Sequence, residues 1–176
     1  MAISETQLIH GGATVDEETG AVNVPIYQTS TFRQDGIGQM RGGWEYSRTG
    51  NPTRAALERL IAELEGGVAG FAYASGMAAI TSVLDLLEAG DEVLISSNVY
   101  GGTYRVLDKV FTRFGLRYRV VNTSDSKAFE ASIRPESKAV LVESPANPLL
   151  AITDLAAVAE IAHAHGMLDI VDNTFM

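Results

Sequence analysis

No cysteine occurs in the sequence, which excludes disulfide bonds and thiol chemistry and fits a protein of the reducing cytoplasm. Positive charge is also scarce, because 13 lysines and arginines stand against 22 aspartates and glutamates and leave a formal net charge of −9. This acidic balance argues against nucleic acid or a membrane surface as a partner. Neither a hydrophobic run of membrane-spanning length nor a signal-peptide core is present, so we expect a cytoplasmic protein.

Two phosphate-binding patterns of α/β proteins are missing as well. The glycine cluster at residues 66–70 precedes a predicted strand instead of following one, and it lacks the G-x-G-x-x-G spacing. The P-loop lysine pattern does not occur either. These absences count against a dinucleotide-binding Rossmann domain and against a P-loop nucleotide-binding protein. Hydrophobic residues make up 46% of the chain, which is enough for a globular core.

The order of elements predicts an α/β fold. Residues 1–52 have little helical periodicity and many glycines and threonines, which indicates an extended N-terminal arm. From Pro52 onward helices and strands alternate, which predicts a mostly parallel sheet with helices on both faces. The expected helices span 53–65, 77–87, 103–114, 126–133 and 154–165. The expected strands span 68–73, 92–96, 116–122, 139–143 and 167–171.

The first motif with chemical content is Tyr46-Ser47-Arg48 followed by a turn. In extended backbone, residues two apart point the same way, so Tyr46 and Arg48 can reach one anion together. A phenol beside a forked, permanently charged guanidinium suits a phosphate dianion. The alternative is an ordinary strand end with Arg48 on a solvated face.

The second motif is Ala74-Ser75-Gly76-Met77, between a predicted strand and a predicted helix. The free N–H groups of a first helical turn form an anion site, and Gly76 lets a ligand come close. A plain strand-to-helix turn remains the alternative here.

The third motif is Asp172 at the carboxyl end of the strand expected at 167–171. Ligands of open α/β sheets bind at that end, and a carboxylate there needs a cation or several hydrogen-bond donors. Capping of the following turn is the alternative role for Asp172.

In this order, the three motifs resemble the pyridoxal-phosphate enzymes of cysteine and methionine metabolism, the trans-sulfuration family of cystathionine lyases and synthases. The resemblance runs over essentially the whole chain. It implies a fold-type I, pyridoxal-phosphate-dependent transferase-like architecture. Further matching segments lie at 8–12, 24–27, 30–32, 99–105 and 143–148.

The resemblance also implies roles for five residues around pyridoxal 5'-phosphate. Asp172 is expected to pair with the pyridine nitrogen, and Tyr100 to stack on the ring and to act as a catalytic acid or base. Gly76 and Met77 are expected to bind the phosphate through backbone N–H groups. Asn147 is expected to hydrogen-bond near the ring hydroxyl. Without the resemblance, Tyr100 is a half-buried tyrosine before a helix and Asn147 a turn residue.

The family pattern makes Tyr46 and Arg48 contacts to the cofactor of the neighbouring subunit. It therefore implies a homo-oligomer with shared active sites, with a dimer of dimers, a homotetramer, as the expected assembly. Residues 1–52 would form an arm for dimer contacts and cofactor donation in trans, and residues 53–176 the first part of the large cofactor-binding domain. No metal site is expected.

The lysine that holds the cofactor in this family has no counterpart in the sequence. The lysines of the chain are Lys109, Lys127 and Lys138, and none lies in the Ser/Thr-rich turn that the family pattern requires. We therefore expect an incomplete portion of an enzyme, with the rest of the large domain and the C-terminal domain absent and no catalysis by this chain alone.

The reaction expected from the resemblance is C–S cleavage in cystathionine or a related thioether amino acid, as in bacterial cystathionine γ-lyases. Gly102 stands where methionine γ-lyases have a cysteine, which lowers the expectation for methionine as substrate. The products would be cysteine, 2-oxobutanoate and ammonia. A cystathionine γ-synthase, a β-lyase, and a catalytically inactive fragment or interaction module remain as alternatives.

Overall fold

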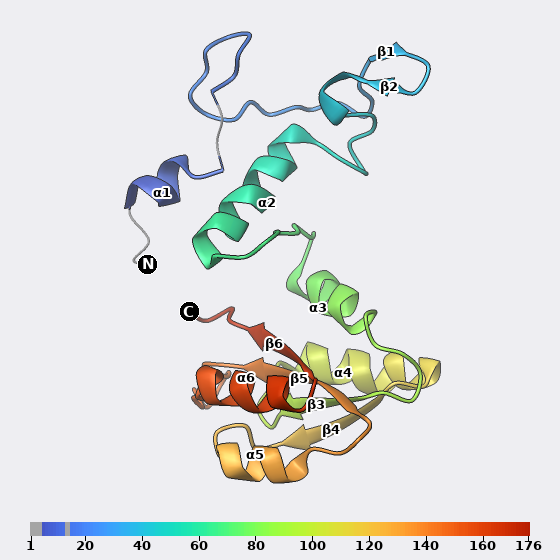
Figure 1. The fold of residues 1–176 in the computed structure, drawn as a ribbon, viewed down its shortest axis with the longest axis vertical. Coiled ribbons are helices and arrows are strands. Elements are labelled where there is room, and N and C mark those ends of the chain that lie inside the picture. The colour runs from blue at the N-terminus through green and yellow to red at the C-terminus, as the bar shows by residue number, and fades with distance from the viewer. Residues whose placement is uncertain (1–4, 13–14) are drawn as a thin grey trace. The chain divides into compact units, whose positions relative to one another are not determined.

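The computed structural model describes residues 5–12 and 15–176 (Figure 1). They divide into two compact units, residues 1–74 and 75–176, and each unit is described by itself. The division predicted from the sequence lies earlier, between residues 52 and 53. Within the described ranges, no helix is long and apolar enough to cross a membrane.

The second unit is built on a four-stranded parallel sheet in the order β4-β3-β5-β6. This confirms the predicted α/β class, and each strand bound lies within two residues of its expected position. The strands are β3 (Glu92–Ser96), β4 (Arg117–Val121), β5 (Ser137–Glu143) and β6 (Leu168–Asp172).

Helices connect these strands, and three of the helices begin at residues with the right capping chemistry. Ser75, Asp125 and Asp154 each accept a hydrogen bond from a backbone N–H of the following first turn, which satisfies donors that have no intrahelical partner. The helix expected at 103–114 is divided in two by residue 110. The helical elements are α3 (Gly76–Leu84), α4 (Gly101–Lys109), the 3₁₀ turn η2 (Phe111–Phe114), α5 (Ser126–Ser132) and α6 (Leu155–Ala164).

Both faces of the sheet are covered, as its apolar strands require. Val93 and Ile95 of β3 pack on one side with side chains of α3, α4 and η2. Leu94, between them, points to the other side and packs with α5 and α6. Figure 1 shows α4 on one side of the strands and α5 with α6 on the other. The carboxyl ends of all four strands therefore share one edge.

The first unit has less regular structure. Its elements are α1 (Glu5–His10), β1 (Gln34–Gly36), β2 (Gln39–Met40), the 3₁₀ turn η1 (Arg41–Gly43) and α2 (Pro52–Glu65). Pro52 opens α2 as predicted, and the side chain of Asn51 caps it by accepting from the Thr53 N–H. Helix α1 departs from the expected extended arm, of which residues 1–4 and 13–14 lie outside the described residues.

The strand expected at residues 68–73 is wrong, since the structure, which describes all six residues, contains no strand there. A strand requires a hydrogen-bonded neighbour. Here the Ala72 N–H instead donates to Glu58 Oε1 of α2 at 3.0 Å. Val68 is fully exposed and Phe71 is 76% exposed, so the apolar run that indicated a buried strand is not buried in this chain.

Glu92 forms the main buried ion pair of the sheet, at the amino end of β3, and is only 5% exposed. Arg119 donates from Nε to Oε1 at 3.0 Å and from Nη2 to Oε2 at 2.8 Å, and the Ser137 hydroxyl donates to Oε2 at 2.7 Å. The hydrogen bonds from Arg119 hold the pKa of the Glu92 carboxyl below its ordinary value, against the effect of burial.

Glu92→Gln is expected to lower the free energy of unfolding by about 3 kcal/mol near neutral pH, because Arg119 loses its charged partner. A carboxyl with a lowered folded-state pKa stabilises fully above its ordinary value of 4.5 and loses this effect as pH falls through the folded value. The difference between the two proteins should therefore shrink below that pH. Urea unfolding followed by circular dichroism over an acidic pH series measures it.

Glu136→Gln provides the matched control. Glu136 lies beside Ser137, but its carboxylate is 3.8 Å from Arg117 in a partly exposed pair. Such pairs contribute at most about 1 kcal/mol. A pH-independent loss in Glu92→Gln, or an equal loss in both variants, would contradict the prediction.

Candidate functional site

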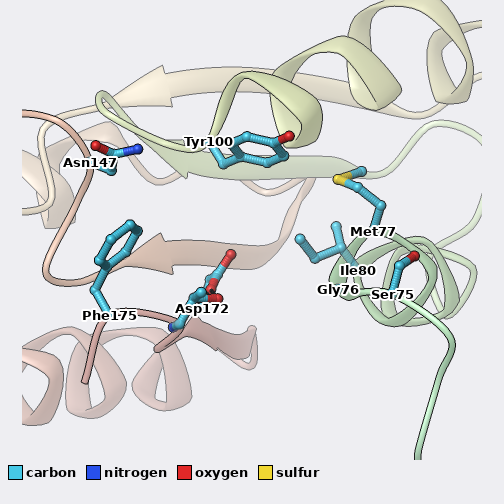
Figure 2. Close-up of a pocket in the computed structure, with 9 residues that line it drawn as sticks. Ser75, Gly76, Met77, Ile80, Tyr100, Asn147, Asp172 and Phe175 are labelled. Atoms are coloured by element: carbon cyan, nitrogen blue, oxygen red, sulfur yellow. Dashed lines mark hydrogen bonds between the residues drawn. The ribbon is translucent and has the colours of Figure 1, made fainter.

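A cavity of about 430 Å³ opens at the carboxyl edge of the sheet, entirely within the second unit (Figure 2). It lies between the first turn of α3, the residue before α4, the loop after β5 and the end of β6. Five of the seven cofactor-contact residues expected from the sequence meet in this one cavity. The lining residues are Ser75, Gly76, Met77, Ile80, Tyr100, Asn147, Asp172, Thr174 and Phe175.

The first turn of α3 forms one wall. The Ser75 hydroxyl accepts from the Ala78 N–H at 3.2 Å and the Ser75 carbonyl from the Ala79 N–H at 3.1 Å. The N–H groups of Gly76 and Met77 precede the first intrahelical bonds and so have no acceptor within the helix. A Cβ added to Gly76 would meet nothing within 4 Å, so the helix end is open to a ligand. This wall suits a phosphate.

Asp172 lies across the cavity at the end of β6. Its Oδ1 accepts from the Thr174 N–H at 3.1 Å and from the Thr174 hydroxyl at 2.5 Å, so Asp172 does cap the following turn. Both bonds use Oδ1. Figure 2 shows the carboxylate pointing toward the middle of the cavity, where the other oxygen can accept from a protonated nitrogen.

The Tyr100 ring covers the cavity from the opposite side, and Gly102 leaves the space that the ring occupies. A Cβ on Gly102 would lie 2.3 Å from Tyr100 Cε1 and 2.9 Å from Met77 Sδ. Real Cβ contacts are not that short, so the ring can fold back over the first turn of α4 only because residue 102 has no side chain. Figure 2 shows the Met77 sulfur directed at the Tyr100 ring.

Asn147 joins the cavity from the loop after β5, and its backbone N–H donates to Glu143 Oε1 at 3.1 Å. The Tyr100 N–H donates to the other oxygen of Glu143, Oε2. Glu143 lies in the segment 143–148 that resembles the family, but the sequence alone indicated no role for it. A charged residue ending the otherwise apolar run 139–143 was the available signal.

Tyr46 and Arg48 lie in the first unit and are not among the residues that line the cavity. The Arg48 guanidinium carbon lies 4.8 Å from the centroid of the Tyr46 ring, a cation–π contact. Backbone carbonyls of Arg48 and Thr49 accept from the Arg54 guanidinium at 3.2 and 3.0 Å. The two side chains are thus in contact, but through a turn at residues 47–49, in which the Thr49 N–H donates to the Tyr46 carbonyl at 3.0 Å, and not through the extended backbone that the sequence indicated.

No lysine lines the cavity. Lys109 Nζ is 2.6 Å from Asp108, and Lys138 Nζ donates to the Pro135 carbonyl at 3.0 Å, near the amino end of β5. Lys127 lies at the start of α5. Across residues 5–12 and 15–176, no group of three or more His, Asp or Glu side chains is placed to hold a metal ion.

The cavity therefore offers a phosphate seat, an aromatic cover and a carboxylate facing that cover. This donor set fits a flat, phosphorylated heterocycle with a basic ring nitrogen, which is the chemistry of pyridoxal phosphate. Residues 5–176 match the model of the Cys/Met metabolism PLP-dependent enzymes. The chain belongs to this family.

Individual relatives agree with the family assignment. The chain is 57% identical to a cystathionine gamma-lyase of Bacillus subtilis over 97% of its own length and 45% of the relative. It is 53% identical to a cystathionine beta-lyase of Lactococcus lactis over 99% of its length and 46% of the relative. The crystal structure of cystathionine gamma-lyase from Lactobacillus plantarum complexed with L-serine superposes with a TM-score of 0.92 at 58% identity, over 97% of this chain and 44% of that one. The chain thus spans less than half the length of these relatives.

Gly102→Ala is expected to push the Tyr100 ring out of its place over the cavity, because the new methyl group would overlap it. Aromatic stacking contributes about 0.5–1.5 kcal/mol, so the affinity for pyridoxal phosphate should fall roughly two- to tenfold. Absorption titration of the full-length protein measures the affinity, and a crystal structure of the variant locates the ring.

Gly101→Ala is the control, since its Cβ would meet only the flexible end of Arg105, at 3.2 Å from Nη1. It should bind pyridoxal phosphate like the unaltered protein. An unmoved Tyr100 ring in Gly102→Ala, or equal losses in both variants, would refute the steric account.

Proposed function

We propose that the protein carrying this chain is a pyridoxal-phosphate-dependent carbon–sulfur lyase that cleaves cystathionine by γ-elimination to cysteine, 2-oxobutanoate and ammonia. The observation that carries the proposal is the Asp172 carboxylate facing the Tyr100 ring across one cavity, beside the open first turn of α3. The names of the similar γ-lyases support the choice of reaction.

In this proposal each wall of the cavity has one task. The N–H groups of Gly76 and Met77 bind the phosphate, and Asp172 keeps a proton on the ring nitrogen. Asn147 donates to the ring hydroxyl. Pyridoxal phosphate, when bound, supplies an electron sink for carbanion chemistry. The Tyr100 ring covers one face, and its hydroxyl moves a proton to or from the substrate.

The rest of the site is assigned by family resemblance. Tyr46 and Arg48 of one subunit reach the phosphate in the neighbouring subunit of a dimer, and dimers pair into a tetramer. The lysine that binds the cofactor and the arginine that binds the substrate carboxylate come from sequence other than residues 1–176. The substrate is a thioether amino acid of the cytoplasm.

A second candidate is β-elimination from the same substrate, which the 53% identity to a cystathionine beta-lyase favours. A third is γ-replacement, as the name of a 50% identical cystathionine gamma-synthase of Mycobacterium leprae suggests. Product analysis separates all three. Incubation of the full-length protein with cystathionine yields cysteine and 2-oxobutanoate by γ-elimination, but homocysteine and pyruvate by β-elimination. A protein that binds pyridoxal phosphate and releases neither pair, yet condenses an acylated homoserine with cysteine, is a synthase.

Asp172→Asn is expected to lower kcat by about 10²- to 10³-fold, the usual effect of removing one preorganised charge partner of a developing charge. An amide cannot hold the ring nitrogen in its protonated form as a carboxylate does. The cofactor absorption band should shift as well. Steady-state kinetics and a visible spectrum of the reconstituted variant measure both effects.

Asp169→Asn serves as the control on the same strand. Asp169 is paired in register with Val140, whose side chain packs on the α5 and α6 side, away from the cavity. This variant should keep the spectrum and kcat unchanged. Full activity in Asp172→Asn would remove Asp172 from the proposed machinery.

A further inference from the structure

Glu143 is a buried acid that the proposed chemistry does not use. It ends β5, one of the two inner strands of the sheet, and is 4% exposed. Its two oxygens accept from two separate segments: Oε2 from the Tyr100 N–H and Oε1 from the Asn147 N–H, the latter at 3.1 Å. Both segments carry a residue that lines the cavity (Figure 2).

The donors around Glu143 are neutral. Within the part of the chain that the structure describes, no ion pair includes this residue. Both oxygens accept from a backbone N–H, and hydrogen bonds to an ionised acceptor are about twice as strong as neutral ones. An acid buried without a cation is costly unless such bonds compensate it.

Tyr100 explains why one of these bonds is needed. It occupies the N-cap position of α4, where serine, threonine, aspartate or asparagine is preferred, and its own side chain makes no capping hydrogen bond. The Glu143 carboxylate meets the Tyr100 N–H next to this helix end, where negative charge is also favourable. The acid thus stabilises a helix start that a tyrosine cannot cap.

Asp172 belongs to the same arrangement. It is paired in register with Glu143 on the neighbouring parallel strand, so both side chains project to the same face of the sheet. The N–H of Ser144, the residue after Glu143, donates to the Asp172 carbonyl at 3.3 Å. The end of β5 therefore contacts the segments of Tyr100, Asn147 and Asp172.

We propose that Glu143 is a positioning residue, which fixes Tyr100 and Asn147 relative to Asp172 so that a flat ligand fits between the Tyr100 ring and the Asp172 carboxylate. The identity of that ligand rests on the function proposed above, whereas the two hydrogen bonds do not. Two measurements, one without and one with pyridoxal phosphate, keep these two claims apart.

Glu143→Gln retains the size of the side chain but turns an NH₂ group toward one of the two N–H donors. In the full-length protein without pyridoxal phosphate, hydrogen exchange at the Tyr100 or Asn147 amide should accelerate at least roughly tenfold, because a hydrogen bond to a charged acceptor is lost. The dissociation constant for pyridoxal phosphate should rise by a similar factor, with a shifted visible absorption maximum.

Glu92→Gln is the matched control. Glu92 is an equally buried acid of the same sheet, at the opposite ends of the strands, and accepts from Arg119. This variant should lose global stability yet leave the absorption maximum and the exchange of the two amides, relative to the rest of the sheet, unchanged. If both variants alter the two amides and the spectrum alike, Glu143 has only a structural role and the proposal is overturned.

Glu143→Asp keeps the charge but shortens the side chain by one methylene group, so it should protect one of the two amides and not both. It also provides the test if Glu143→Gln does not fold. Unchanged exchange at both amides in a folded variant would overturn the positioning role. Faster exchange in a protein that never binds pyridoxal phosphate would uphold the positioning role and refute the proposed cofactor chemistry.

Discussion

The parallel hydrogen-bonded ladder around β5 is the constraint on which the candidate site depends. Because β5 pairs with β3 on one side and β6 on the other, all in parallel, the carboxyl ends of the three strands fall at one edge. Tyr100, Asn147 and Asp172 follow or end these three strands. The ladder therefore brings residues separated by up to 72 positions to one edge of the sheet.

The buried acids at the two ends of this sheet have different kinds of hydrogen-bond partner. At the amino edge, Glu92 forms a bidentate ion pair with the Arg119 guanidinium. At the carboxyl edge, Glu143 accepts hydrogen bonds from two backbone N–H groups and forms no ion pair within the described residues. The first arrangement joins neighbouring strands through side chains, and the second joins the end of β5 to the backbone of two segments that line the cavity.

Much of this fold was predictable because periodicity and capping residues act locally. The strand at 92–96 was expected from the alternation of helices and strands along the chain, and the helix beginning at Pro52 from the preference of proline for the first helical turn. The strand expected at 68–73 failed because strand formation depends on a neighbour, which a local pattern does not reveal. The grouping of Gly76, Asp172 and Tyr100 around one ligand was implied by the family resemblance, since the strand expected before Gly76 is absent from the sheet.

Two features of the site lay beyond such reasoning. The role of Gly102 depends on where the Tyr100 ring lies in three dimensions, and the role of Glu143 on two backbone N–H groups 43 and 4 residues away. Sequence patterns describe side chains, whereas both of these constraints involve either backbone groups or a missing side chain. Both roles can be recognised only from the three-dimensional structure.

The choice of backbone rather than side-chain partners for Glu143 has a consequence for divergence within the family. Peptide N–H groups are present whichever amino acid other than proline occupies positions 100 and 147, so the two hydrogen bonds to Glu143 do not depend on the side chains there. Support that comes from backbone groups is compatible with a change of the side chains that it orients. Relatives named for γ- and for β-elimination share more than half of this sequence, as such a separation of support from chemistry allows.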